Sequence, residues 1–177
     1  EINRFHCELA KKYPGRVYAY FGIDPRRPGG IKLFEKAVKE WGAKGLSFYP
    51  VTGFYINDRI CYPYYQKCID LGVPVCAHTG FQHDFRGLAK YSDPILWDDV
   101  AYDLPDLTAI ICHTGLDVEP SDHSWEKAVC VAYTKANLHV DVADWQRNYT
   151  VRVLDNMPEL FRKLRIMRDR LGAHRIL

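Results

Sequence analysis

The sequence of 177 residues has no apolar run longer than a β-strand, whereas a membrane-spanning helix needs roughly 20 consecutive apolar residues. Charge of one sign is not in excess either, because 24 Lys and Arg residues face 22 Asp and Glu residues and leave a formal net charge of +2. Such a balance produces no long-range field toward nucleic acid or an anionic membrane. We therefore expect neither as a partner.

Targeting and nucleotide-binding signals are also absent. The chain starts Glu1-Ile2-Asn3-Arg4, which contains neither an initiator methionine nor a signal peptide, so we expect it to begin within a longer protein. No G-x-G-x-x-G or G-x-x-x-x-G-K-[ST] pattern follows any predicted strand. This absence counts against a nucleotide-binding sheet.

The six cysteines do not form a C-x-x-C pair, the spacing that supports structural zinc or redox chemistry. Cys76 and Cys112 lie inside apolar strands, where a free thiol packs as a small hydrophobic group. We therefore expect reduced, buried or half-buried thiols in a cytoplasmic protein.

The sequence does contain enough apolar material for one domain. Hydrophobic residues make up 47% of the chain and aromatic residues 14%, which is typical of a globular core. A length of 177 residues suits a single domain that spans residues 1–177. Six short β-rich runs alternate with helical patterns along the chain. The expected strands are 17–23, 44–49, 74–78, 109–113, 137–143 and a last one that opens at 175–177.

Helical periodicity fills the segments between the strands. Glycine ends several of these segments, as at Gly42, Gly72 and Gly172. The expected helices are 1–13, 31–41, 59–71, 93–104, 121–136 and 158–171. Strict alternation favours an α/β fold with parallel strands, either a doubly wound open sheet or a (β/α)8 barrel.

Two neighbouring strands end on the same tripeptide, His78-Thr79-Gly80 and His113-Thr114-Gly115, one strand–helix unit apart. Histidine is the commonest protein ligand of zinc-like metals and a natural acid or base near neutral pH. The carboxyl ends of parallel strands share one edge, where a barrel builds its active site. The pair therefore favours a barrel and predicts a catalytic rim. Because a full barrel has eight strands and six are expected, the sequence predicts an incomplete (β/α)8 barrel.

Further residues at the expected rim are candidates for substrate contacts. Tyr49 ends its strand, and Trp145 follows the strand at 137–143, where it can form a wall of the pocket. His83 and Arg86 lie in the loop after the third strand, and Arg86 suits a substrate carboxylate. Asp141 is a candidate partner that orients a metal ligand.

Several runs, in this order, resemble the amidohydrolase-related family of metal-dependent TIM-barrel enzymes. The matching runs are Gly42 to Gly45, Leu71 to Gly80, Leu104 to Leu107, Ile111 to Gly115, Asn137 to Val142 and Leu171 to Leu177. The resemblance covers nearly the whole chain, and it does not single out a substrate.

The family pattern has His-x-His on the first strand, histidines at the ends of the fifth and sixth strands, and an aspartate at the end of the eighth. By that pattern, His78 is the fifth-strand metal ligand. His113 is the sixth-strand histidine, which is either a ligand or the general base that deprotonates the attacking water. The resemblance implies one divalent metal, zinc first and manganese second. Because the sequence has no His-x-His and ends before the aspartate, it implies a barrel truncated at both ends.

The resemblance implies a hydrolase that acts on a lactone, an amide or a similar bond in a small cyclic or carboxylate-bearing substrate. A non-oxidative decarboxylase of an aromatic or unsaturated acid is the alternative within the family. The alternative outside catalysis is a barrel that serves as a binding or assembly module, because one or two ligands are too few for a catalytic zinc site. An exposed sheet edge also favours a homo-oligomer.

Overall fold

The computed structural model describes residues 1–81, 85–116, 123–145 and 157–177. Its centre is a sheet of five parallel strands whose spatial order follows the chain. The strands are β1 (Tyr20–Gly22), β2 (Gly45–Phe48), β3 (Val75–His78), β4 (Ala109–Cys112) and β5 (Leu138–Val140). Parallel strands in chain order are the arrangement of a (β/α)8 barrel, whereas a doubly wound sheet reverses its order at a switch point. The structure confirms the incomplete barrel.

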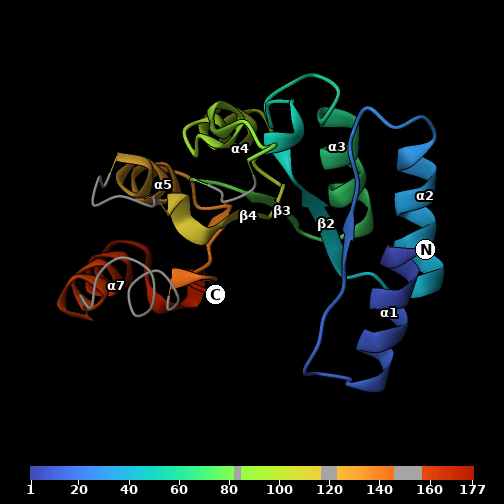
Figure 1. Ribbon diagram of the computed structural model, residues 1–177, viewed down its shortest axis with the longest axis horizontal. Coiled ribbons are helices and arrows are strands. Elements are labelled where there is room, and N and C mark those ends of the chain that lie inside the picture. The colour runs from blue at the N-terminus through green and yellow to red at the C-terminus, as the bar shows by residue number, and fades with distance from the viewer. Residues whose placement is uncertain (82–84, 117–122, 146–156) are drawn as a thin grey trace.

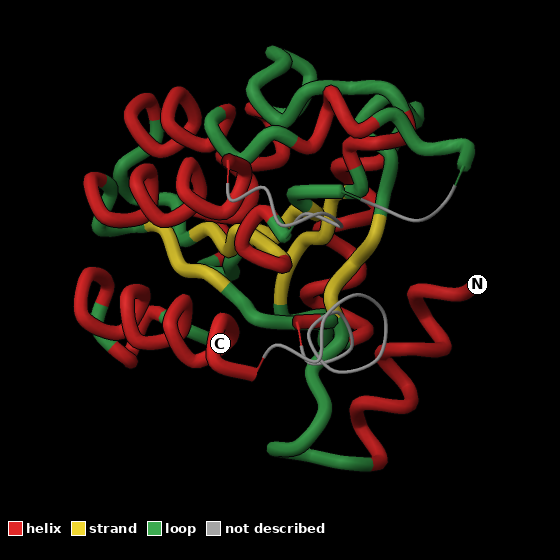
Figure 2. The backbone as a smooth tube through the Cα atoms, turned by 60° about the vertical axis from the view of Figure 1, so that its left-hand side comes forward, coloured by secondary structure: helices red, strands yellow, loops and turns green. Residues whose placement is uncertain are grey.

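Helices cover the outer face of this sheet. In Figure 1 they form an arc around the strands that runs from α1 through α4 to α7, and Figure 2 shows the strands lying between them. The helices are α1 (Ile2–Lys12), α2 (Gly30–Lys36), α3 (Tyr62–Leu71), α4 (Leu96–Asp103), α5 (His123–Thr134) and α7 (Met157–Leu171). A π-helical turn, Ala37–Trp41, extends α2 to the expected end at Gly42.

Each strand of the sheet is shorter than the sequence predicts. β1 begins at Tyr20 instead of Val17, and β5 ends at Val140 instead of Ala143. A β-rich composition does not distinguish paired residues from the extended chain that leads into a strand. The sixth strand is a single bridge between Ile176 and Val140, where Leu177 N–H donates to Val140 O at 2.9 Å.

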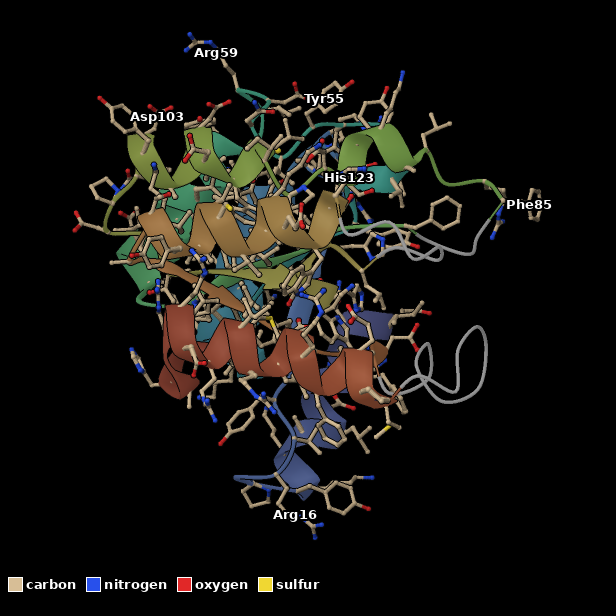
Figure 3. The ribbon with its side chains drawn as sticks, turned by 90° about the vertical axis from the view of Figure 1, so that its left-hand side faces the viewer. Arg16, Tyr55, Arg59, Phe85, Asp103 and His123 are labelled. Carbon is tan, nitrogen blue, oxygen red and sulfur yellow. The ribbon has the colours of Figure 1, made fainter. Side chains whose placement is uncertain are left out.

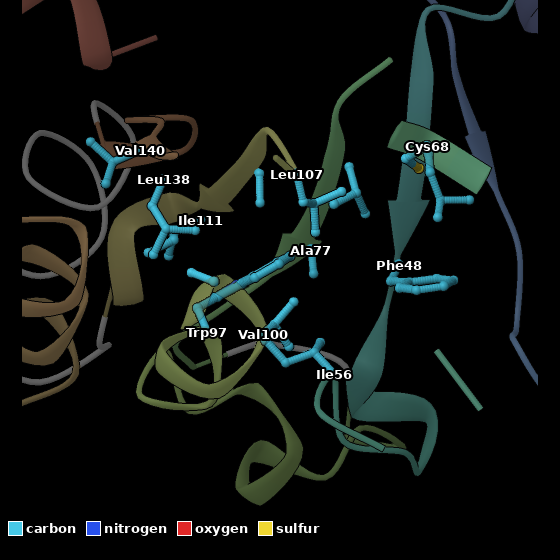
Figure 4. Packing of buried hydrophobic residues seen from close by; sticks show 14 of the residues in the cluster. Phe48, Ile56, Cys68, Ala77, Trp97, Val100, Leu107, Ile111, Leu138 and Val140 are labelled. Carbon is cyan, nitrogen blue, oxygen red and sulfur yellow. The ribbon is translucent and has the colours of Figure 1, made fainter. Parts of the chain in front are cut away.

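The strand register divides the side chains between two faces of the sheet. One row of register partners is at most 1% exposed and consists of Phe48, Ala77, Ile111 and Val140. Figure 4 shows these residues in one cluster with Trp97 of α4. Because side chains alternate along a strand, the next row, which includes Ser47, Cys76 and Ile110, faces the inner side of the barrel. The core therefore lies between the sheet and its helices.

Helix α1 closes the outer edge of β1 with one side chain. Asn3 Nδ2 donates to Gly22 O at 2.8 Å, and Gly22 N–H donates to Asn3 Oδ1 at 3.0 Å. A neighbouring strand would make bonds of the same kind to this backbone. The Asn3 amide therefore satisfies the N–H and the carbonyl of Gly22, on an edge that the described part of the sheet leaves unpaired.

The cysteines are free thiols, as the sequence predicts. Five are buried or half-buried, but Cys130 is exposed, so the expectation of burial is wrong at this position. Its place on α5 is the reason, because Cys130 shares the outward face of the helix with the exposed Glu126 and Tyr133. Cys76 and Cys112 form a hydrogen bond that lowers the pKa of the Cys76 thiol and raises the pKa of Cys112.

Within the described ranges, no helix combines the length and the apolar character needed to cross a bilayer. His83 and the expected start of the fifth helix at Ser121 lie outside the described residues. The loop after β3 is described again from Phe85, which is 93% exposed and projects from the body of the molecule in Figure 3.

Candidate active site

The two His-Thr-Gly tripeptides bring their histidines into contact at the carboxyl ends of β3 and β4. The ring centroids of His78 and His113 are 4.9 Å apart, with the rings at 66° to each other. The Tyr49 ring, at the end of β2, lies 5.2 Å from the His78 ring. The structure therefore brings together three of the residues that the sequence predicts at the rim.

His78 has a buried imidazole whose pKa is lowered and whose Nε2 atom has no hydrogen-bond partner among the described residues. Burial, followed by the nearby His113, lowers the pKa of His78 from 6.5 to about 4. Its Nε2 atom is buried and has no hydrogen-bond partner in the described part of the chain. Leaving a buried polar atom unpaired is unfavourable, and such atoms in proteins often mark a site for a ligand or an ion. The ring is thus held in the protonation state that a metal ligand requires.

The ring of His113 is oriented by a backbone carbonyl. Its Nδ1 lies 3.0 Å from Ala143 O. A carbonyl oxygen can only accept a hydrogen bond, so we assign the proton of the neutral ring to Nδ1. The lone pair is then on Nε2, where it can bind a metal or accept a proton.

The backbone at His113 has an unfavourable conformation. His113 has φ of 61° and Thr114 has φ of 48°, both in the left-handed region. The sequence predicts His113 as the last residue of the strand, but β4 ends at Cys112 and His113 begins a left-handed turn. Positive φ is strained for non-glycine residues, above all for a β-branched threonine. Such a turn persists only where its surroundings hold it in place.

Residues at the end of β5 provide this support. The carboxylate of Asp141 accepts a hydrogen bond from His113 N–H at 2.8 Å. The Trp145 indole N–H donates to His113 O at 2.7 Å, and the Thr114 hydroxyl donates to Asp141 O. Asp141 and Trp145 therefore contact the backbone of His113.

The two tripeptides are also bonded to each other. The hydroxyl of Thr79 donates to Cys112 O at 2.6 Å and accepts from Gly115 N–H at 2.9 Å. Gly80 has φ of +82°, and a Cβ atom there would lie 2.4 Å from Leu116 O. Only glycine permits this approach of the two turns. The motif thus fixes one histidine relative to the other.

The remaining predicted site residue, Arg86, lies in the exposed loop after β3. Its guanidinium carbon is 5.7 Å from the centre of the Phe85 ring. Sequence reasoning missed the role of the two threonine hydroxyls, although the repeated tripeptide was a visible signal. It also missed the Ala143 carbonyl, because no residue type marks a backbone acceptor.

The donor set matches part of a metal site. The described stretches contain no group of three or more His, Cys, Asp or Glu side chains arranged to hold a metal ion. The Nε2 of His78, buried and without a partner within these stretches, fits as one ligand, and the adjacent His113 fits as a second ligand or as a base.

Comparison with known proteins identifies the family to which this chain belongs. The family model described as amidohydrolase matches residues 1–177. The chain belongs to the amidohydrolase family. This membership confirms the resemblance that the sequence motifs carry. No curated protein matches this chain significantly.

Solved structures with the same fold are distant in sequence from this chain. An uncharacterised TIM-barrel protein from Bordetella bronchiseptica is 22% identical with a TM-score of 0.73, over 99% of this chain and 57% of that one. A 5-carboxyvanillate decarboxylase from Novosphingobium aromaticivorans, with bound manganese, is 14% identical with a TM-score of 0.67, over 99% and 58%. A probable 2-pyrone-4,6-dicarboxylic acid hydrolase from Acinetobacter baumannii is 14% identical with a TM-score of 0.69, over 99% and 61%. The chain thus spans less than two thirds of each.

Proposed function

We propose that the protein is a metal-dependent hydrolase that acts on a small cyclic or carboxylate-bearing substrate. In this proposal, His78 binds one divalent metal through Nε2, and zinc is the first choice with manganese the second. The observation that carries it is the buried Nε2 of His78, which has no partner in the part of the chain that the structure describes, beside a second histidine whose ring is bonded to Ala143 O.

When bound, a divalent metal supplies Lewis acidity, which polarises a carbonyl group and makes water more acidic. His113 is the general base and takes a proton from the attacking water on Nε2, because its Nδ1 is bonded to Ala143 O. His78 remains neutral above about pH 4, so protons do not compete for its Nε2 near neutrality. Asp141 supports this arrangement through the backbone N–H of His113.

Substrate contacts in the proposal come from the rim. Tyr49 is 45% exposed beside His78 and can offer its ring and hydroxyl to a cyclic substrate. Arg86 is the proposed partner of a substrate carboxylate. The sequence also predicts Trp145 as a wall of the pocket.

Decarboxylation of an aromatic acid is the second candidate. The similar structure from Novosphingobium is a decarboxylase with manganese and a nitrobenzoic acid, and this fold is therefore known to support that reaction. In this case, His113 in its protonated form would deliver a proton to the carbon that loses carbon dioxide.

Metal binding by the full-length protein tests the proposal first. Zn²⁺ and Mn²⁺ are titrated separately by isothermal calorimetry after chelator treatment, and we expect one ion per chain. His78→Asn should weaken binding at least about 10-fold, since it removes a ligand. His174→Asn, at an exposed position in the turn Ala173–Arg175, is the matched control and should leave affinity unchanged. Equal affinity of both variants would exclude His78 as the ligand.

Activity assays then separate the candidate functions. Metal-loaded protein is incubated with carboxylated lactones and with aromatic carboxylic acids, and ring opening and carbon dioxide release are measured. Ring opening that falls about 10²- to 10⁴-fold in His113→Gln supports the hydrolase with His113 as base. Carbon dioxide release without ring opening favours the decarboxylase. Absence of stoichiometric metal binding would overturn both and favour the non-catalytic binding module.

A further inference from the structure

Trp145 has a buried side chain whose polar atom is directed at the backbone of the proposed base. It is 1% exposed, and its indole N–H donates to His113 O at 2.7 Å. A substrate wall must present a ring face to the pocket, whereas this ring is almost completely enclosed by protein. The geometry therefore points to a role for Trp145 other than the wall that the sequence predicts.

The indole N–H of Trp145 binds a residue with a strained backbone, His113. His113 and Thr114 both have positive φ, a conformation that depends on outside hydrogen bonds. The His113 carbonyl is held by Trp145, and its N–H is held by the Asp141 carboxylate. Both polar groups of the peptide backbone of His113 are thus bonded to the segment that follows β5, and the carbonyl also accepts from Leu116 N–H at 3.0 Å within the turn.

The same segment also fixes the imidazole. Ala143, which lies between Asp141 and Trp145 in the chain, accepts the Nδ1 proton of His113. The backbone and the ring of His113 are consequently positioned relative to one short stretch, 141–145. If the His113 carbonyl loses its bond to the Trp145 indole, the peptide group can rotate, and we expect the 3.0 Å bond between His113 Nδ1 and Ala143 O to lengthen.

We propose that Trp145 is a positioning residue: its indole N–H holds the left-handed turn at His113 so that Nδ1 stays on Ala143 O and Nε2 stays available for proton transfer. The inference rests on the proposed function for its catalytic consequence. Its structural consequence, a single dominant tautomer of His113, is independent of any reaction.

Two variants at this position remove the N–H in different ways. Trp145→Phe keeps an aromatic ring, and Trp145→3-benzothienylalanine keeps the two-ring shape with sulfur in place of N–H. The second variant preserves the packing if the first does not fold. Trp97→Phe is the matched control, since Trp97 is 0% exposed and its indole nitrogen has no partner in the described residues.

The decisive measurement is the tautomer of His113 in the metal-free chain, from long-range ¹H–¹⁵N NMR correlations at pH 8. We expect the Nδ1–H form to dominate in the wild type and in Trp97→Phe. The share of the Nε2–H form should rise several-fold in both variants at position 145. An unchanged tautomer ratio in the folded variants would overturn the proposal, whether or not the chain proves to be an enzyme.

Kinetics give a second reading once an active substrate is known. A positioning role predicts that kcat falls about 10-fold in the variants at position 145 while KM stays within about twofold, because the lost interaction aligns the base. A substrate wall predicts the reverse, a higher KM with unchanged kcat. That reverse result would also overturn the proposal.

Discussion

The hydroxyl of Thr79 is the most informative single group to remove, because it bonds two backbone atoms of the neighbouring turn at His113, one before the turn and one within it. Thr79 is 1% exposed, donates to Cys112 O at 2.6 Å and accepts from Gly115 N–H at 2.9 Å. Thr79→Val keeps the shape and removes both bonds. It removes the side-chain partner of a part-buried carbonyl and of a buried N–H, and each group left unpaired costs about 1–3 kcal/mol.

We therefore expect Thr79→Val to lower the free energy of unfolding by about 3 kcal/mol. Thr79→Ser is the control, because it keeps the hydroxyl and loses one methyl group, which is worth about 0.8 kcal/mol. Urea unfolding followed by tryptophan fluorescence gives both values, provided that the m-value is unchanged. A loss in Thr79→Val no larger than that in Thr79→Ser would refute the proposed bridge between the two turns.

Three further predictions concern stability. Because the pKa of His78 is lowered from 6.5 to about 4, the free energy of unfolding should be unaffected by His78 above pH 6.5 and should fall by about 3 kcal/mol as the pH decreases to about 4. Urea unfolding of chelator-treated protein measures this pH dependence, and His78→Gln should flatten it. Gly80→Ala, which meets Leu116 O, should lower the thermal midpoint more than Gly15→Ala, which meets nothing within 4 Å at a similar φ; equal shifts would contradict the close approach. Arg175 donates from Nη1 to Ala132 O at 2.8 Å and from Nε to Leu171 O at 3.0 Å, so Arg175→Ala should lose about 2 kcal/mol in urea unfolding, and Arg168→Ala, at an exposed position, should lose less than 0.5 kcal/mol. Similar losses in these two variants would exclude Arg175 as a support for the ends of α5 and α7.

Local signals in the sequence predict most of the framework. Alternating β-rich and helical runs give the order of strands and helices, and glycines such as Gly42 and Gly72 mark helix ends at left-handed φ. The pairing of His78 with His113 follows from parallel topology, which places the ends of neighbouring strands at one edge. These features depend on short stretches of chain, so the sequence alone is sufficient.

The conformation of the site depends on distant contacts, which the sequence does not display. Neither His113 nor Thr114 favours positive φ, and the groups that hold them there are 27 to 32 residues away, at Asp141 and Trp145. A tryptophan after a strand indicates a rim residue, but only the fold determines whether its ring or its N–H is used. The substrate contact of Arg86 stays a prediction for the same reason, because it depends on the position of a long exposed loop.

The amide of Asn3 has a consequence for how this sheet can grow. An unpaired β-edge is a template on which other strands assemble, and proteins protect such edges in various ways. Here the helix α1 places one side chain over Gly22 and occupies its N–H and its carbonyl together. Any strand that joins β1 at Gly22, from this molecule or another, must first displace that amide. Extension of the sheet at Gly22 thus exchanges two hydrogen bonds for two others. The edge is therefore protected against strand addition, and a strand that does join there gains no additional hydrogen bond at this residue.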